Sequence, residues 1–329
     1  MRYSDDAFAT IMLMSQAMPG REELVSPLSA GEYHALRGRV RLSSLRTMSN
    51  LAHTDMGGMM QYLNMPETEA YRICLLLNRV LPIAMSIEGF MNAGISIVTL
   101  DDERYPVQIL DPLHKKAPPM LYYSGRPEVF KQWAVAILGN EPIVGDAEEK
   151  VRAFASRAVK EDLVIITDGT AGLGRIAEDQ AYQDGGFCIE VLPGGMNVRL
   201  ADERVQRMIA ERQLLLLSIR HPDAPVSVSN ALERNALLHA LPLASIVFAV
   251  RENSGNTWEG AVEALKLLRD KYLYAWDTPI YPGNAKLIGR GAIPFDGDDR
   301  RFPQMFDQWK TSVAEQMSMF DRKKPRGLR

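Results

Sequence analysis

Apolar side chains in the first part of the chain recur with the period of a helix. Leu76, Leu77 and Val80 follow Ile73 at three, four and seven positions, which predicts one apolar helix face. Runs typical of strands are scarce up to about residue 100. The pattern therefore predicts an all-helical N-terminal domain over residues 1–100.

Two helix starts can be located inside this domain. Ser29 and Glu32, in the stretch SAGE, have the spacing of a capping box, in which each side chain binds the backbone N–H of the other residue. Pro66 followed by Glu67 is a second typical start, because the N–H that Pro lacks would be unpaired there and an acid favours the first turn. We expect helices to begin at both places.

Near residue 100 the pattern changes. The stretch MNAGISIVTLDDERYPVQILDPLHKKAPPMLYYSG is rich in Pro and short β-branched runs and is interpreted as a connector. Short apolar runs then alternate with helical patterns: WAVAIL, LVIIT, FCIEVL, LLLLS, SIVFAV and KYLYAW. This alternation predicts βαβ units and a doubly wound, Rossmann-like α/β domain with a parallel sheet over residues 101–300. Residues 301–329 are expected to form a C-terminal helix and a basic tail.

Four of the apolar runs are followed by turns that contain glycine. Ligands of an open parallel sheet bind beyond the carboxyl ends of its strands, where helix N-termini present unpaired N–H groups. Glycine lets an anion approach the backbone because it has no Cβ. We therefore expect one rim that binds phosphate or another anion. Its candidate residues are Gly139, Asn140, Gly169, Thr170, Gly172, Gly194, Gly195, Ser254 and Gly255.

The stretch from Tyr105 to Phe295 resembles the DNA-processing protein A (DprA/Smf) family. YPVQILDPLHKKAPPMLYYSG is similar to the family's YPxxL…PPxLYxxG, VAILGN to its strand and Gly-Ser-Arg turn, and ITDGTAGLGRIAEDQAY to its SGxAxGIDxxAHxxAL. The stretches IEVLPGGMN, ERNALLHAL, VFAVRENSGNTWEGAVEA and PGNAKLIGRGA follow in the family's order. Together these motifs extend over most of the predicted α/β domain.

The resemblance implies a Rossmann-like domain that binds single-stranded DNA without catalysis or a cofactor. It implies delivery of that DNA to a RecA-type recombinase, in DNA recombination and natural transformation, and pairing of the protein as a homodimer. Four further residues join the candidate nucleic-acid or phosphate-binding set, namely Arg234, Asn235, Asn284 and Lys286.

The chain departs from the family pattern at charged positions. Glu141 takes the place of Arg in the Gly-Ser-Arg turn, so a carboxylate that repels phosphate replaces a guanidinium that pairs with it. Gly174 replaces the Asp of GID, Glu178 the His of AH, and Ala236 the second Arg of RNR. The chain is therefore identified as a divergent member.

Two other functions stay open. The broader superfamily includes enzymes that hydrolyse nucleoside monophosphates, and Glu259 stands four residues after Gly255, where a carboxylate could orient water. An acid at that position also simply favours a helix N-terminus. The other alternative is a protein-interaction module that has lost strong DNA binding. Trp258 could stack on a base, but an indole there fits a core position equally well.

Composition limits these functions further. The 329 residues carry a formal net charge of −3, so no overall basic field attracts nucleic acid and a local patch must do so. The five histidines stand far apart without metal-ligand spacing, so no metal is expected. GTAGLG resembles part of a dinucleotide fingerprint, but Glu190, the acid at the appropriate distance, lies inside a predicted strand, so no nicotinamide cofactor is expected.

The N-terminus and the cysteines indicate the compartment. Asp5 and Asp6 stand where a signal peptide needs positive charge, and no segment reaches the roughly 18 apolar residues of a membrane span. Cys74 and Cys188 lie in apolar runs, as buried reduced thiols do. We therefore expect a cytoplasmic protein with no membrane partner.

Overall fold

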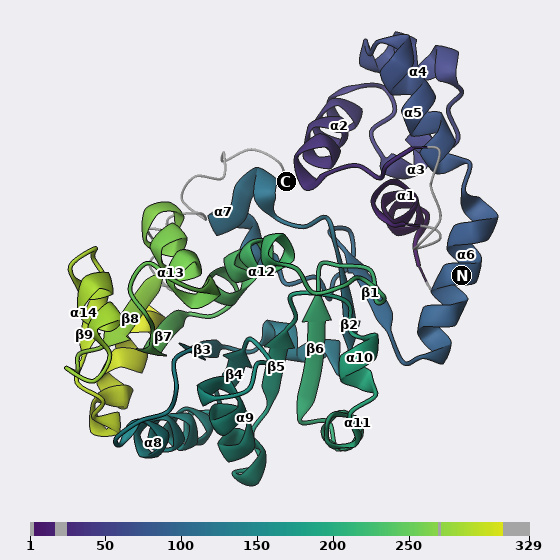
Figure 1. Cartoon of the computed structure of the whole chain (residues 1–329). Helices are drawn as coiled ribbons and strands as arrows, with labels where there is room; N and C mark the ends of the chain where they lie inside the picture. The colour runs from purple at the N-terminus through teal and green to yellow at the C-terminus, as the bar shows by residue number, and fades with distance from the viewer. Residues whose placement is uncertain (1–2, 17–24, 269–270, 312–329) are drawn as a thin grey trace. The chain divides into compact units, whose positions relative to one another are not determined.

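The computed structural model describes residues 3–16, 25–268 and 271–311 (Figure 1). Contacts within the chain divide it into two compact units. Unit 1 contains residues 1–132 and 189–237, and unit 2 contains residues 133–188 and 238–329. The domain boundary near residue 100 remains a prediction, because this division follows spatial contacts rather than independent folding.

The N-terminal part of unit 1 is helical, as the sequence predicts. Ser29 and Glu32 form the expected capping box, and Tyr33 directly behind it is fully buried. A hydrogen bond from Arg72 is the main cause that lowers the pKa of Glu32 to about 2. The helices are α1 (Asp5–Met14), α2 (Ala30–Leu42), α3 (Met48–Ala52), α4 (Met56–Leu63), α5 (Glu67–Leu77) and α6 (Val80–Asn92).

Helix α5 begins at Glu67 behind Pro66, as predicted, but it ends earlier than the apolar period indicates. Ile73, Leu76 and Leu77 are buried, whereas Val80 is 49% exposed and begins α6. The prediction of one face running to Val80 was therefore wrong. The chain bends between the two helices, so their apolar positions do not continue one stripe.

The predicted connector contains regular structure. Its strands are β1 (Ser96–Thr99) and β2 (Met120–Ser124), separated by the short helices η1 (Val107–Ile109), α7 (Leu110–Leu113) and η2 (His114–Lys116). β1 pairs antiparallel with β2, and β2 pairs antiparallel with β6 (Leu214–Ser218). The parallel sheet that the sequence predicts is therefore extended at this edge by two antiparallel strands from the connector.

The strand order in unit 1 continues from β1, β2 and β6 to β5 (Cys188–Val191), of which residues 189–191 belong to this unit. Its remaining elements are η3 (Pro127–Lys131), α10 (Asn197–Leu200) and α11 (Glu203–Ala210), while α12 (Val228–Ala240) crosses into unit 2. All residues of β6 are buried. This explains the unbroken apolar run LLLLS.

Unit 2 has the parallel strands that the sequence predicts, in the order β4, β3, β7, β8 and β9. Helices α8 and α9 lie together on one side of these strands and α13 lies on the other, so the unit is doubly wound (Figure 1). The strands are β3 (Ala134–Gly139), β4 (Val164–Thr167), β7 (Ala244–Ala249), β8 (Tyr272–Trp276) and β9 (Ile293–Phe295). The helices are α8 (Ala147–Lys160), α9 (Leu173–Gln183), α13 (Asn256–Leu267), α14 (Pro282–Ile288) and η4 (Asp299–Arg301).

Helical residues 302–311 complete the core of unit 2. Phe302 lies edge-on to Phe154 of α8, with ring centroids 4.9 Å apart. Trp309 is fully buried, and its indole N–H donates to the Tyr274 hydroxyl at 3.1 Å. The predicted basic tail lies outside the described residues.

Among the described residues no single helix is long and apolar enough to cross a bilayer. The bent pair α5 and α6, at 47° to each other, meets the length and composition criteria only when taken together.

Replacing Trp309 tests whether residues 302–311 belong to the core. We expect Trp309→Ala to lower the free energy of unfolding by about 3–5 kcal/mol, since it leaves a cavity and an unpaired tyrosine hydroxyl. Tyr71, which is 56% exposed on α5, provides the control, and Tyr71→Ala should cost about 1 kcal/mol or less. Urea unfolding measures both, and equal losses would contradict the assignment.

Candidate functional site

The loops at the carboxyl ends of β3, β4 and β7 meet at Gly139. A Cβ at this position would lie 2.7 Å from Cδ1 of Leu173, at the start of α9, and 3.1 Å from the backbone nitrogen of Ala249, at the end of β7. The absence of a side chain therefore lets three segments approach each other closely. The predicted convergence of turns holds for these segments of unit 2.

The turn after β3 also contacts the loop after β7. Gly255 has φ +85°, a conformation that residues with side chains rarely adopt, and a Cβ on it would collide with the side-chain amide of Asn140. The exposed Asn140 side chain thus lies directly against Gly255, and Ser254 beside it is exposed as well. The Gly-Asn turn places its amide against the loop that precedes α13.

Several of the predicted backbone donors are used inside the loops. The Thr170 N–H and hydroxyl both donate to the Asp168 carboxylate, at 3.1 and 2.7 Å, and the Gly169 N–H donates to the Thr167 hydroxyl at 3.3 Å. The N–H of Asn140 donates to the Ala249 carbonyl at 3.0 Å. An anion would therefore meet the first turns of α9 and α13 rather than these N–H groups.

The charged side chains of these loops are largely matched. Arg251 is 63% exposed and pairs with Glu141 at 3.1 Å, and Lys286 is 59% exposed and lies 3.9 Å from Glu252. Arg175, in the first turn of α9, is half-buried and makes no ion pair or hydrogen bond within the described part of the chain. The sequence analysis missed Arg175 and Arg251, although Arg175 directly follows one predicted turn and Arg251 directly precedes another.

Three of the predicted contact residues have structural roles in the interior. Asn284 is fully buried and bridges the ends of β7 and β8 through Val250 N–H and the carbonyls of Phe248 and Trp276. Arg234 is only 2% exposed and donates to the Val191 carbonyl at 2.7 Å, and Asn235 is 3% exposed. Arg234 thus fixes the carboxyl end of β5.

The remaining predicted turn belongs to unit 1. The Gly195 N–H donates to the Ala224 carbonyl at 2.8 Å, and a Cβ on Gly195 would collide with the Pro222 carbonyl. Gly194 packs against the same segment, near Val226. These glycines allow the loops after β5 and β6 to lie against each other.

Two further candidates have ordinary environments. Glu259 is exposed in the first turn of α13, where an acid favours the helix N-terminus. Trp258 is 3% exposed and packs under Arg290, whose guanidinium lies 5.4 Å from the ring, so it occupies the core position considered above. Glu190 lies inside β5, as the sequence predicts, and is fully buried and paired with Arg199.

The described residues contain no group of three or more His, Cys, Asp or Glu side chains that could hold a metal ion.

Substituting Gly139 tests the close approach of the three segments. We expect Gly139→Ala to lower the free energy of unfolding by about 1–3 kcal/mol, because Leu173 and the backbone of β7 must move apart. Gly89, in α6 with open space at its Cβ position, is the matched control, and Gly89→Ala should raise stability by about 0.5–1 kcal/mol. Urea unfolding measures both variants. If both substitutions change the free energy of unfolding in the same direction, the close approach at Gly139 is not what requires glycine there.

The doubly wound fold, with loops that meet where glycine allows close approach, defines a Rossmann-like domain. In the sequence this domain follows a helical N-terminal region. Residues 96–302, well over half of the chain, match the family model of DNA recombination-mediator protein A. The chain belongs to this family, whose members act in DNA processing by binding rather than as enzymes. The sequence-based assignments of the family and of a non-enzymatic protein are thus confirmed.

Two solved structures share the fold. DNA processing protein A from Streptococcus pneumoniae is 20% identical, with a TM-score of 0.61 over 83% of this chain and 96% of its own. DNA processing protein A from Helicobacter pylori is 21% identical, with a TM-score of 0.54 over 66% of this chain and 98% of its own. No curated protein matches the sequence.

Proposed function

We propose that this chain binds single-stranded DNA, without chemistry, at the loops after β3, β4 and β7 of unit 2. Membership of the DNA recombination-mediator protein A family supports a role in DNA processing. The Helicobacter pylori structure is described as having a unique single-stranded DNA binding mode. The observation that carries the proposal is the meeting of these loops, with Leu173 against Gly139 and Asn140 against Gly255.

The charges at these loops support a phosphate backbone as the ligand. Arg175 has no acidic partner among the described residues and lies in the first turn of α9, where the helix dipole also favours an anion. Arg251 and Lys286 stand in the same region but have Glu141 and Glu252 as neighbours. A phosphate has to compete with these carboxylates, so binding should be weaker than at a site with unopposed cations.

The remaining candidate residues stay in the proposal with different roles. Asn140, Gly172 and Ser254 lie in the converging loops, and Asn284 bridges the ends of β7 and β8 in the same unit. Arg234 holds the end of β5 in unit 1. Delivery of DNA to a RecA-type recombinase, pairing as a homodimer and a cytoplasmic location follow from the family resemblance and belong to the same proposal.

The direct test is fluorescence anisotropy with a labelled single-stranded oligonucleotide at several salt concentrations. We expect binding that weakens as salt rises, because phosphate contacts release counterions. A duplex of the same length should bind less tightly, and an excess of free nucleotide should not displace the strand. An absent or salt-insensitive signal would overturn the proposal.

Arg175 should be a principal phosphate contact. We expect Arg175→Gln to weaken single-strand binding and to reduce the slope of log affinity against log salt by about 0.7, the value for one phosphate contact. Arg207, an exposed arginine of α11 with no ion pair in the described structure, is the matched control. Equal effects of Arg175→Gln and Arg207→Gln would argue against a specific contact.

Glu141 should oppose binding. Glu141→Gln frees Arg251 and removes a negative charge, so we expect the affinity for single-stranded DNA to rise by roughly twofold to fivefold at low salt. Glu161, which pairs with Arg157 at the other end of α8, is the control, and Glu161→Gln should leave the affinity unchanged. An unchanged affinity for the Glu141 variant would remove Arg251 from the proposed site.

A further inference from the structure

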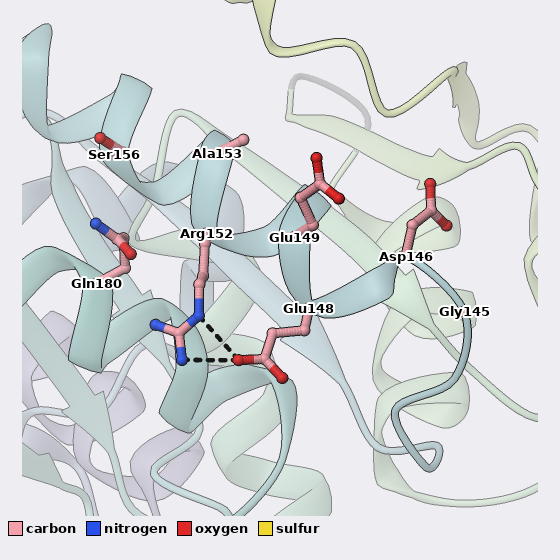
Figure 2. Close-up of a pocket in the computed structure, with 8 residues that line it drawn as sticks. All are labelled: Gly145, Asp146, Glu148, Glu149, Arg152, Ala153, Ser156 and Gln180. Carbon is pink, nitrogen blue, oxygen red and sulfur yellow. Dashed lines mark hydrogen bonds and ion pairs between the residues drawn. The ribbon is translucent and has the colours of Figure 1, made fainter.

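The outward face of α8 carries a groove that the loops above do not use. It has a volume of about 620 Å³ and is lined by Asp146, Glu148 and Glu149 at the start of the helix (Figure 2). Gln180 of α9 also contributes to its lining. All of these residues belong to unit 2.

The groove keeps a negative charge, because its one ion pair neutralises only one of its carboxylates. Arg152 pairs with Glu148 at 2.8 Å, while Asp146 and Glu149 turn away from this pair and have no cationic partner among the described residues (Figure 2). Three carboxylates against one guanidinium leave a net charge of −2. Acids in a first turn stabilise the helix itself, so their number alone does not identify a partner.

An apolar edge adjoins these acids. Ile143, Val144 and Ile280 are 38%, 46% and 37% exposed. A Cβ on Gly145, which lines the groove, would lie 2.9 Å from Cδ1 of Ile280. Val144 donates its N–H to the Tyr281 hydroxyl at 3.2 Å, which holds this edge in place. The face therefore fits a segment that is both basic and partly apolar.

The chain itself contains such a segment close by. Residues 302–311 pack against α8 through Phe302 and Phe154, and residues 312–329 follow them. This tail contains Met317, Met319 and Phe320, followed by the basic residues Arg322, Lys323, Lys324, Arg326 and Arg329.

The tail is also long enough to reach the groove. Its 18 residues can span up to ~60 Å when extended, whereas Glu148 lies six positions before Phe154 in α8, a distance of only ~9 Å along the helix. The length, the charge and the apolar residues of the tail therefore all fit the groove on α8.

We propose that the C-terminal tail, residues 312–329, docks on the outward face of α8 in its own chain. Its apolar residues lie against Ile143, Val144 and Ile280, and its basic residues neutralise Asp146 and Glu149. The basic residues of the tail are thereby paired with an acidic surface of the same unit. This contact does not depend on the proposed binding of DNA.

Disulfide trapping in the full chain tests the proposal. Ala153 lines the groove and Pro325 lies among the basic residues of the tail, so Ala153→Cys with Pro325→Cys keeps every charge. We expect a disulfide within one chain under mild oxidation. The matched control places the first cysteine at the exposed Ala285 of α14, and that pair should form at least about fivefold less. Single-cysteine variants measure the background from Cys74 and Cys188.

Charge dependence provides the second measurement. Adding Asp146→Asn and Glu149→Gln, or Lys323→Glu and Lys324→Glu in the tail, should lower the disulfide yield several-fold, as should high salt. Equal disulfide yields with the first cysteine at position 153 and at position 285 would overturn the proposal. So would a disulfide yield at position 153 that stays the same in all of these charge variants and at high salt. A disulfide found only between two chains would equally overturn it, because the tail would then dock on a second copy.

Discussion

The geometry of the candidate site depends on the absence of a side chain at Gly139. Parallel strands end at the same edge of a sheet, but their loops come into contact only where the backbone allows close approach. Gly139 provides this, because Leu173 and Ala249 occupy the space that a Cβ would need. The positions of Asn140 and Gly255 follow from that contact. Packing between segments far apart in the sequence therefore sets the shape of the site before any charge contributes.

Charge then decides how strongly this edge attracts an anion. The divergent Glu141 does more than replace a family arginine, because it also pairs with Arg251 on the neighbouring loop. Lys286 faces Glu252 in a similar way, so that of these three cations Arg175 alone makes no ion pair in the described structure. The site thus combines the fold of the DNA recombination-mediator protein A family with a local positive charge that neighbouring carboxylates largely neutralise. That balance agrees with the overall net charge of −3.

The six apolar runs of the second half were predicted as strands and all became strands, because a parallel strand covered on both faces is apolar throughout. The capping box at Ser29 was predictable because it is local. β1, β2 and β9 were missed because they are short and lie at or next to sheet edges, beside Pro-rich sequence. The burial of individual polar residues could not be predicted either. The residue types of Arg234 and Asn284 fit a contact with a phosphate as well as a contact with a strand end.

The burial of Arg234 changes how loss-of-function substitutions at this position should be interpreted in this protein. A screen for loss of function would recover substitutions at Arg234, and a sequence comparison would attribute them to a lost ligand contact. In this chain the guanidinium instead anchors the last carbonyl of β5, so such alleles would act through a loosened strand end. Temperature-sensitive phenotypes and rescue by stabilising second-site changes would then mark Arg234 as part of the scaffold.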